Sequence, residues 1–519
     1  MRARFRQVIA NPLTIVGVIC MLVLIIFHEQ TSMYYYLTIA QLIYVPVVVC
    51  QIAKLARWQS VAILIGQLAV TSLFFITNEV CTWIGASIYF ITTLAIGWSG
   101  MERFLKRGFT NTAEVMIDLG LLYIVMGGGW FFAHVTGIST GFSPIITWLT
   151  AIHFHYSACL LCITVGLLGR IWRSRYFTFC AAVIAAGPML VAVGITFSRI
   201  IEIVSVSLYV IAIFSLTIYT FRIRLKVATS LFIRLAFCTL CFTIVWSFLY
   251  AYSNLTGTVL VDIPDMLKFH GVLNCILFGG AITIAWSLYV PDSTHQSYSF
   301  PLSKVRGEVR EKLEGHHALV DEMDEFINTQ LVPTRIYDFY ENTINYSLTA
   351  SVKWAVWFKP FAFLYQFISR KIGQLNLPFS SKAFAMDGTI SKINAAMDGR
   401  DNPRVWQRFA NGQTIFSAIY AIHKDNERAY MNIALPLPKS AMHGILVLEV
   451  RAQRLYLTSD ANGDAGTYFS LGPYTFKLPL HEYFTIWEEK DELRATHRMT
   501  LFGLKFLHID YWIRQRYEK

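Results

Sequence analysis

Long apolar runs separated by short loops fill the first 290 residues of the chain. A helix needs about 20 mostly apolar residues to cross the hydrocarbon core of a bilayer, and these runs have roughly that length. We therefore predict an all-α membrane bundle of about ten spans over residues 1–290. The predicted spans cover residues 12–28, 34–53, 58–76, 80–98, 114–136, 143–168, 176–197, 200–221, 228–250 and 266–289.

Basic residues are concentrated in alternate loops of this region. The clusters precede the first span and follow the second, fourth, sixth and eighth, at Arg2–Arg6, Lys54–Arg57, Arg103–Arg107, Arg170–Arg175 and Arg222–Lys226. Short loops rich in Lys and Arg stay on the cytoplasmic side, so both termini are expected in the cytoplasm. These clusters also supply part of the net charge of +11. The positive charge therefore gives no reason to expect a nucleic-acid partner, and we expect none. The expected partner is the lipid bilayer.

The composition changes after the last span. Residues 291–332 carry many charges of both signs and predict an amphipathic connector, with a surface helix over 303–328. Residues 333–519 alternate short apolar runs with turn signals, a pattern typical of antiparallel strands, and 334–350 is the first predicted strand. We therefore expect a cytoplasmic α+β domain, rich in antiparallel strands, over 333–519. All nine cysteines precede this domain, which suits a reducing compartment.

One aromatic and basic stretch of this domain, residues 353–371, has helical periodicity after Pro360. Aromatic rings and basic side chains together suit a helix that lies on anionic lipid at the inner leaflet. A buried core helix of the domain explains the same pattern equally well. In the first interpretation, the membrane contacts come from Trp357, Lys359, Phe361, Arg370 and Lys371.

Several predicted spans carry polar side chains, which are costly at membrane depth and tend to face a cavity or a partner. The candidates for a substrate path are His153, His155, Tyr156, His270, Asn274, Asp118 and His134. His153 and His155 point about 200° apart on a regular helix, so at most one of them shares a site with His270. Arg199 and Glu202 lie about one turn apart and are expected to form an ion pair.

Three functions fit these features. The polar spans favour a transporter of unknown substrate, with the soluble domain as an accessory. The second function is a membrane-embedded enzyme that modifies lipid or uses a metal or haem held by His153 and His270. The third is a non-catalytic membrane sensor or stress protein whose soluble domain binds lipid. The chain has no Walker lysine and no nucleophile elbow, so we assign no catalytic residue and expect no cofactor.

Several sequence blocks resemble a known family. The run Leu149–Ser157 (LTAIHFHYS), followed by Gly166–Arg170, and the run Phe269–Asn274 are similar to blocks of the YndJ-like family of bacterial membrane proteins. The segment Ile117–Trp130 fits that family as well, so the resemblance covers most of residues 80–290. The resemblance implies a multi-pass protein in the cytoplasmic membrane of Bacillus-type bacteria, of a kind sometimes described as transporters. It implies no substrate and no catalytic residue.

Overall fold

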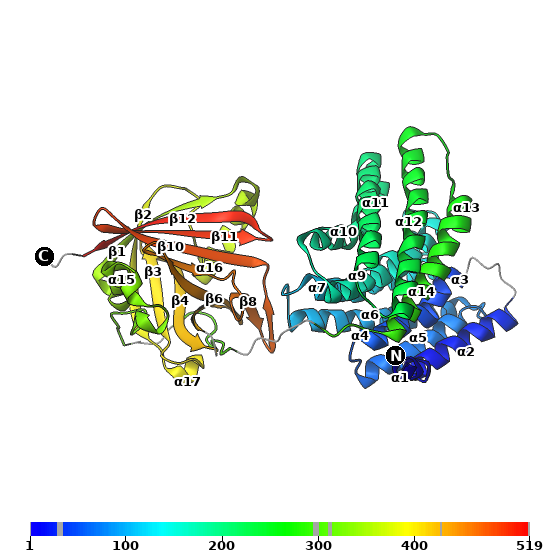
Figure 1. The fold of residues 1–519 in the computed structure, drawn as a ribbon, viewed down its shortest axis with the longest axis horizontal. Helices are drawn as coiled ribbons and strands as arrows, with labels where there is room; N and C mark the ends of the chain where they lie inside the picture. The colour runs from blue at the N-terminus through cyan, green and yellow to red at the C-terminus, as the bar shows by residue number, and fades with distance from the viewer. Residues whose placement is uncertain (1, 29–34, 294–299, 310–313, 426–427, 517–519) are drawn as a thin grey trace. The chain divides into compact units, whose positions relative to one another are not determined.

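The computed structural model describes residues 2–28, 35–293, 300–309, 314–425 and 428–516 (Figure 1). The chain forms two units, which are Met1–Phe104 with Asn111–His295, and Leu105–Thr110 with Gln296–Lys519. The first unit consists of helices, and the second consists mainly of strands.

Every predicted span coincides with a helix or with a run of helical segments. Among the described residues, eight stretches have the length and hydropathy to cross a membrane: Tyr35–Ile52, α6 (Glu79–Leu105), α7 (Thr112–Thr136), Pro144–Ile171, α10 (Arg175–Phe197), α11 (Arg199–Arg222), α12 (Val227–Thr256) and Ile263–Leu288. The other two predicted spans form α2 (Pro12–Phe27) and α5 (Arg57–Ser72), which have only 16 residues each. Together with α1 (Arg2–Ile9), from which it is bent by 56°, α2 gives a ninth candidate span. The predicted helical multi-pass region is confirmed, although the described residues hold eight, or up to nine, membrane-length helices rather than about ten.

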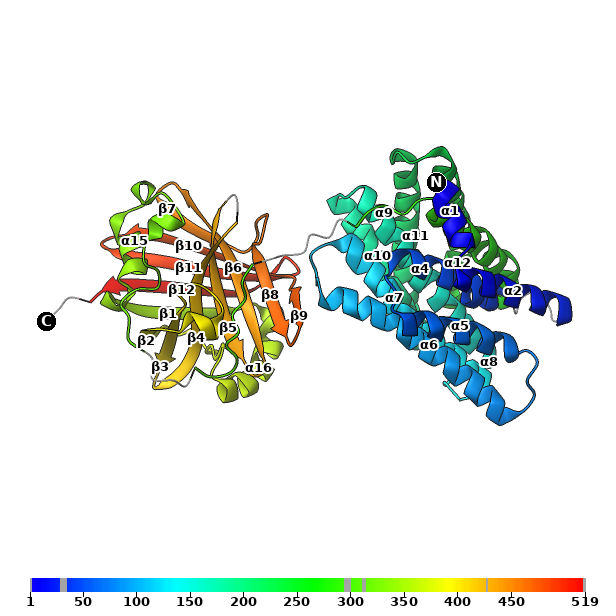
Figure 2. The same cartoon turned by 90° about the horizontal axis from the view of Figure 1, so that it is seen from below.

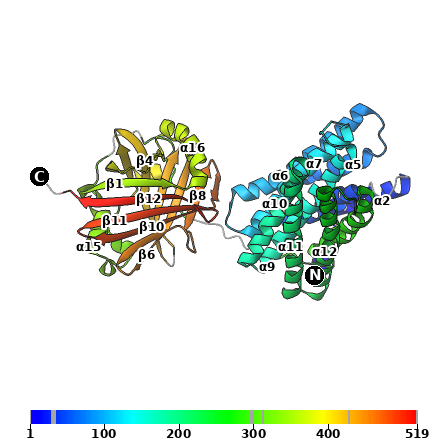
Figure 3. The ribbon, with the colours of Figure 1, turned by 90° about the horizontal axis from the view of Figure 1, so that it is seen from above.

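Capping residues mark where several spans begin. The side chains of Asn111, Ser143, Ser174 and Ser198 accept hydrogen bonds from backbone N–H groups in the first turns of their helices. These bonds satisfy donors that the start of a helix leaves without a partner. Ser198 does so in the tight connection between α10 and α11, so these two helices form a hairpin. Helix α11 lies between α10 and α12 (Figure 3).

In the described part of the helical unit, three spans are interrupted by π-helical segments, in which each turn holds extra residues. The segments are η2 (Ala40–Tyr44), η3 (Phe154–Leu160), η4 (Met266–Gly271) and η5 (Leu273–Phe278). The flanking α-helical pieces are α3 (Tyr35–Ile39), α4 (Val45–Ile52), α8 (Pro144–His153), α9 (Leu161–Ile171), α13 (Ile263–Asp265) and α14 (Gly279–Leu288). Since π turns are rare and often occur at functional sites, these segments identify a candidate site within the helical unit.

In the described part of the second unit, ten antiparallel strands close into a barrel (Figures 1 and 2). Around the ring the order is β1, β2, β3, β4, β5, β6, β7, β10, β11 and β12, and β12 pairs with β1. The hairpin of β8 and β9 pairs with the first half of β6, next to β7. The strands are β1 (Tyr346–Trp354), β2 (Phe384–Lys392), β3 (Arg404–Ala410), β4 (Gln413–Lys424), β5 (Ala429–Leu437), β6 (Ser440–Arg451), β7 (Arg454–Thr458), β8 (Gly466–Leu471), β9 (Tyr474–Lys477), β10 (Leu480–Glu489), β11 (Glu492–Leu501) and β12 (Leu504–Gln515). The predicted antiparallel, strand-rich domain is confirmed.

Two helices lie at different ends of the barrel (Figure 2). Helix α15 (Thr334–Glu341) precedes the start of β1 and buries Ile336, Phe339 and Tyr340. Helix α16 (Lys359–Ile372) follows the end of β1. The chain after α16 donates hydrogen bonds to β4 and β5, from the Asn376 backbone to the Ile415 carbonyl and from the Gln374 side chain to the Ser417 and Pro436 carbonyls. One end is therefore closed by α15, and the residues that follow α16 cross the other.

Two predictions for this unit are wrong. The predicted strand 334–350 begins as helix α15 and becomes a strand only at Tyr346. Ile336, Phe339 and Tyr340 have helical spacing and form one buried face, which decides the local structure. The surface helix predicted over 303–328 is also missing. The described residues of that stretch of the charged connector hold only a 3₁₀ turn, Met323–Glu325.

The beginning of this stretch packs on the barrel instead. The Lys304 backbone N–H donates to the Asp398 carbonyl oxygen at 2.6 Å, and the Ser303 hydroxyl donates to the Asp398 carboxylate at 2.5 Å. Asp398 also pairs with Arg400 at 2.6 Å, and both side chains are fully buried. Arg400 in turn donates to the Asn432 carbonyl and side-chain oxygens of β5. The stretch stays extended because its polar groups bond to the barrel rather than within a helix of their own.

We expect Asp398→Ala to lower the free energy of unfolding of the barrel by about 3–5 kcal/mol, because it leaves the Arg400 guanidinium buried and unpaired. Asp401→Ala is the matched control, since Asp401 is a nearby acid on the surface and should change stability by less than about 0.5 kcal/mol. Pulse proteolysis of the full-length protein in increasing urea measures both. Equal urea midpoints for the two variants would contradict the role of the buried pair.

Candidate functional site

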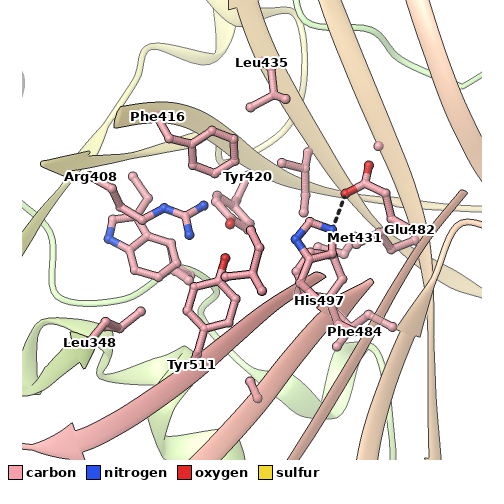
Figure 4. Close-up of a pocket in the computed structure, with 18 of the residues that line it drawn as sticks. Leu348, Arg408, Phe416, Tyr420, Met431, Leu435, Glu482, Phe484, His497 and Tyr511 are labelled. Atoms are coloured by element: carbon pink, nitrogen blue, oxygen red, sulfur yellow. Dashed lines mark hydrogen bonds and ion pairs between the residues drawn. The ribbon is translucent and has the colours of Figure 1, made fainter. Parts of the chain in front are cut away.

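The barrel encloses a cavity of about 130 Å³ (Figure 4). Side chains alternate between the two faces of each strand, so every second residue of the wall points inward. In β11 these are Leu493, Ala495, His497 and Met499. The last three line the cavity, and Leu493 is buried in the hydrophobic core of the barrel. At a requirement of roughly 10–15 Å³ per water, the cavity has room for about ten water molecules.

Most of the cavity lining is apolar. The wall is formed by aliphatic and aromatic side chains that include Leu348, Met431, Leu435, Leu446, Leu457, Ile486, Leu507 and Ile509. At one end the lining includes Phe339 and Tyr340 of α15, and at the other it includes Leu375 and Leu377, which directly follow α16. A concave, mostly apolar site that contains a few polar groups is typical of a small-molecule pocket.

The polar groups of the cavity lie on two sides of it. Figure 4 shows Arg408 of β3 pointing toward Tyr420 of β4 and Tyr511 of β12. On the opposite side, Nε2 of His497 (β11) lies 3.1 Å from Oε2 of Glu482 (β10), within hydrogen-bond distance. The His497 ring also stacks on Phe484 with 3.7 Å between ring centres.

Arg408 is buried without a carboxylate partner. Only 8% of the residue is exposed, and its Nε has no hydrogen-bond partner. Among the described residues, no carboxylate oxygen lies within 4.0 Å of its guanidinium. The guanidinium carbon lies 4.3 Å from the ring centre of Trp406 and 4.0 Å from that of Phe416. Cation–π contacts contribute about 0.5–2 kcal/mol each, whereas the burial of a charge costs several kcal/mol. The cavity therefore holds a positive charge that its own walls stabilise only in part.

Two tyrosine hydroxyls accompany this arginine. Burial raises the pKa of Tyr420 and of Tyr511 above the usual value of 10, and the nearby Arg408 charge opposes this rise. Because the net shift is upward, both hydroxyls keep their protons at neutral pH and are able to donate hydrogen bonds.

Helix α16 presents an apolar face that the barrel does not cover. Phe361 is 59% exposed, Leu364 63% and Phe367 58%, whereas only Ala362 and Ser369 of this helix are buried. Lys359 begins the helix, and Arg370 and Lys371 lie in its last turn. Trp357, just before the helix, donates its indole N–H to the Lys505 carbonyl at 3.1 Å. This pattern differs from that of a core helix, which would bury its apolar face.

In the helical unit, the structure brings together three of the predicted path residues. The rings of His153 and His270 are stacked, with 6.4 Å between their centres and 28° between their planes. Asn274 donates to Nε2 of His270 at 3.1 Å and accepts from the Thr243 hydroxyl at 2.8 Å. His153 ends α8, while His270 and Asn274 lie in η4 and η5, so this polar cluster forms where the spans are π-helical.

The remaining candidates lie elsewhere. His155 faces away from this cluster, and its Nε2 lies 2.7 Å from the Tyr89 hydroxyl. The Tyr156 hydroxyl donates to the Tyr36 carbonyl at 2.7 Å, and His134 lies 3.2 Å from the Pro144 carbonyl. Arg199 pairs with Glu202 at 3.3 Å. Among the described residues, no three His, Cys, Asp or Glu side chains are grouped as metal ligands. A metal ion at the histidine cluster would therefore have only two such ligands, His153 and His270.

Asp118 belongs to a buried ionic cluster rather than to the histidines. Arg103 donates to Asp118 and to Glu114, both at 2.8 Å. Arg170 donates two further hydrogen bonds to the Glu114 carboxylate, at 2.7 and 2.9 Å. These contacts join α6, α7 and α9. The sequence pattern places Arg103 and Arg170 only in basic loops, whereas in the structure both pair with buried acids.

Sequence reasoning did not identify the polar residues of the barrel. Arg408, Glu482, His497 and Tyr511 are spread over more than a hundred residues, and only closure of the barrel brings them together. One local signal was present, since Arg408 follows Trp406 by two residues. In a strand this spacing places the charge on the same face as a buried aromatic ring.

The fold and the cavity together define a class of protein, a multi-pass membrane protein with an antiparallel β-barrel domain. A family model described as YndJ-like protein matches residues 35–278. The "Uncharacterized membrane protein YndJ" of Bacillus subtilis (strain 168) is 34% identical over 468 residues, which cover 85% of this chain and 86% of that relative. The chain belongs to the YndJ-like family. The length of the match carries the similarity into the barrel domain. No solved structure matches the chain.

Proposed function

We propose that this membrane protein binds a lipid-derived apolar ligand in its barrel domain and acts as a sensor or carrier of that ligand. The observation that supports the proposal is the apolar cavity inside the closed barrel. Protein interiors are normally packed with few voids larger than a water molecule. A cavity with room for about ten waters is therefore unusual, and apolar walls hold water poorly.

The size of the cavity favours a ligand with one chain. At roughly 30 Å³ of liquid volume per water, about ten waters correspond to about 300 Å³, the lower end of the range of small-molecule pockets. A ligand with a single acyl or alkyl chain suits this volume better than a phospholipid with two chains.

Helix α16 provides a route between the membrane and the cavity. Large contiguous apolar patches are rare on soluble domains and mark interaction sites, and basic residues at both ends of this helix favour an anionic lipid surface. The residues that directly follow the helix, Leu375 and Leu377, line the cavity. We therefore infer that α16 lies on the bilayer and that the ligand enters beside it.

We further propose that the protein resides in the cytoplasmic membrane of a bacterium, with both termini and the barrel in the cytoplasm. The basic clusters in alternate loops support this orientation. The absence of cysteine from residues 290–519 suits the same compartment.

Transport is the second candidate function. It is favoured by the cluster of His153, His270 and Asn274, which lies where two membrane helices are π-helical. Polar side chains on irregular membrane helices are typical of substrate and proton paths. In this interpretation the barrel domain is an accessory that senses or delivers the ligand.

A dodecanol that carries a photoactivatable diazirine is expected to crosslink inside the barrel of the full-length protein in lipid nanodiscs. Ala495→Trp fills the cavity beside β11 and should reduce barrel labelling by roughly tenfold or more, because each lost methylene contact contributes about 0.8 kcal/mol. Thr496→Trp, on the outer face of the same strand, should leave labelling unchanged. Peptide mass spectrometry locates the label, and pulse proteolysis confirms that both variants are folded. Labelling confined to the membrane helices would refute the ligand site.

A phosphatidylglycerol with a diazirine-bearing acyl chain is expected to label the α16 peptide in nanodiscs. Replacing both Arg370 and Lys371 with Gln should lower this yield by roughly thirtyfold, because each basic residue at an anionic surface contributes about 1 kcal/mol. Replacing Arg454 and Lys490, two exposed basic residues at the α15 end of the barrel, should have no effect. If α16 is not labelled, or if both pairs act alike, the membrane contact is absent.

In liposomes that contain the purified protein and a pH-sensitive dye, a potassium diffusion potential should drive proton flux if the histidine cluster lies on a proton path. His270→Gln should lower the flux to the level of protein-free vesicles, because the amide does not titrate. His134→Gln, outside the cluster, should retain the flux. Wild-type flux equal to that of empty vesicles would count against proton-coupled transport.

A further inference from the structure

We propose that the ligand of the barrel is a single-chain amphiphile with an anionic head, a carboxylate or a phosphate, and that Arg408 binds this head. The inference rests on the proposed function and deepens it, since it assigns the chemical class of the ligand. It goes beyond apolar binding because an apolar ligand alone needs no buried charge.

The geometry around Arg408 points to an anion. Its guanidinium lies in the cavity wall between two aromatic rings, Trp406 at 4.3 Å and Phe416 at 4.0 Å. These rings fix the plane of the guanidinium, but they accept none of its N–H groups in a regular hydrogen bond. Arginine presents its donors in a planar fork that matches carboxylate and phosphate oxygens. Tyr511 offers its hydroxyl oxygen to this guanidinium, but Nε has no partner. An anionic head that enters the cavity would supply the charged acceptors that the protein does not.

Other arginines of the same barrel domain show what a purely structural arrangement looks like. Arg400 is buried against Asp398, and Arg404 of β3 pairs with Asp321. Arg404 and Arg408 lie on the same strand, and each is at most 8% exposed. Arg408 differs from both, because it faces the cavity and has no carboxylate beside it in the described structure.

Two neighbouring groups complete the head site. Tyr420 and Tyr511 point to the same part of the cavity as Arg408 (Figure 4) and keep their hydroxyl protons at neutral pH. Both can therefore donate to the oxygens of an anion. On the opposite wall His497 already bonds to the Glu482 carboxylate at 3.1 Å, so it is less available to a negative head than Arg408 is. This asymmetry orients the ligand, with its head at Arg408 and its chain among residues such as Met431 and Ile509.

The test compares two photoactivatable probes, a diazirine dodecanoic acid and the diazirine dodecanol, on the full-length protein in nanodiscs. The wild-type barrel should be labelled by the acid at about tenfold lower concentration than by the alcohol, as expected for a charge-assisted contact. Arg408→Gln should remove this preference while alcohol labelling persists, which shows that the cavity is intact. Arg498→Gln is the matched control, since Arg498 stacks on Tyr483 on the outer face of β11 and should keep the preference.

Dodecanoate and dodecyl phosphate are then used as competitors. Stronger displacement by dodecanoate identifies a fatty carboxylate as the head, and stronger displacement by dodecyl phosphate identifies a phosphate. Equal labelling by acid and alcohol in the wild type, or an acid preference that survives Arg408→Gln, would overturn the proposal while leaving apolar binding intact. If neither probe labels the barrel, the proposed function itself fails.

Discussion

The pairing of the first and last strands of the barrel is the constraint on which the cavity depends. Strand β1 pairs with β12 from Tyr346 opposite Gln515 to Trp354 opposite Leu507, and this ladder closes the ring. A slip of one residue would turn every inward side chain of the slipped strand outward. The register therefore decides whether Tyr511 lies beside Arg408 inside the cavity or faces solvent. The cavity is thus a property of the whole second unit rather than of a local motif.

Buried charges that pair with an opposite charge hold each unit together, whereas the buried charge without such a partner lies in the candidate site. In the helical unit, Glu114 accepts hydrogen bonds from Arg103 and Arg170, which ties three helices together. In the barrel unit, Asp398 and Arg400 hold an extended segment against the barrel wall. In both places the charge of one side chain is balanced by another, and the result is a rigid contact. Arg408 is buried to a similar extent without such a partner, and it lies where a ligand can reach it.

The sequence predicted the helical region well because hydropathy over some twenty residues is a local property. It also predicted strands where alternating runs were separated by turns, but it did not predict closure of the barrel, which depends on pairing between β1 and β12. Helix α15 was missed because aromatic residues suggested a strand, although Ile336, Phe339 and Tyr340 had helical spacing. Several hairpins carried no glycine signal. The turn Lys490–Asp491 adopts positive φ at both residues with neither glycine nor asparagine.

The two candidate sites also differ in how far the sequence predicts them, because one depends on local patterns and the other on pairing between distant strands. A polar side chain inside an apolar span can be recognised on its own, because its burial in the membrane is costly. The sequence therefore predicts His153, His270 and Asn274 one by one, and the structure brings them together. A charged residue in a strand is ordinary unless it is known to point inward. Nothing near Arg408 in the sequence shows that its partners on β4 and β12 are tyrosines rather than carboxylates.

Native mass spectrometry of the full-length protein, purified in detergent without added lipid and released from the micelles, tests most directly whether the barrel is a ligand site. We expect one tightly held single-chain acidic amphiphile per chain, which remains bound after bulk lipid is stripped and is missing from the cavity-filled Ala495→Trp variant. A chain that carries only loosely bound bulk phospholipid, equally in both proteins, would contradict it.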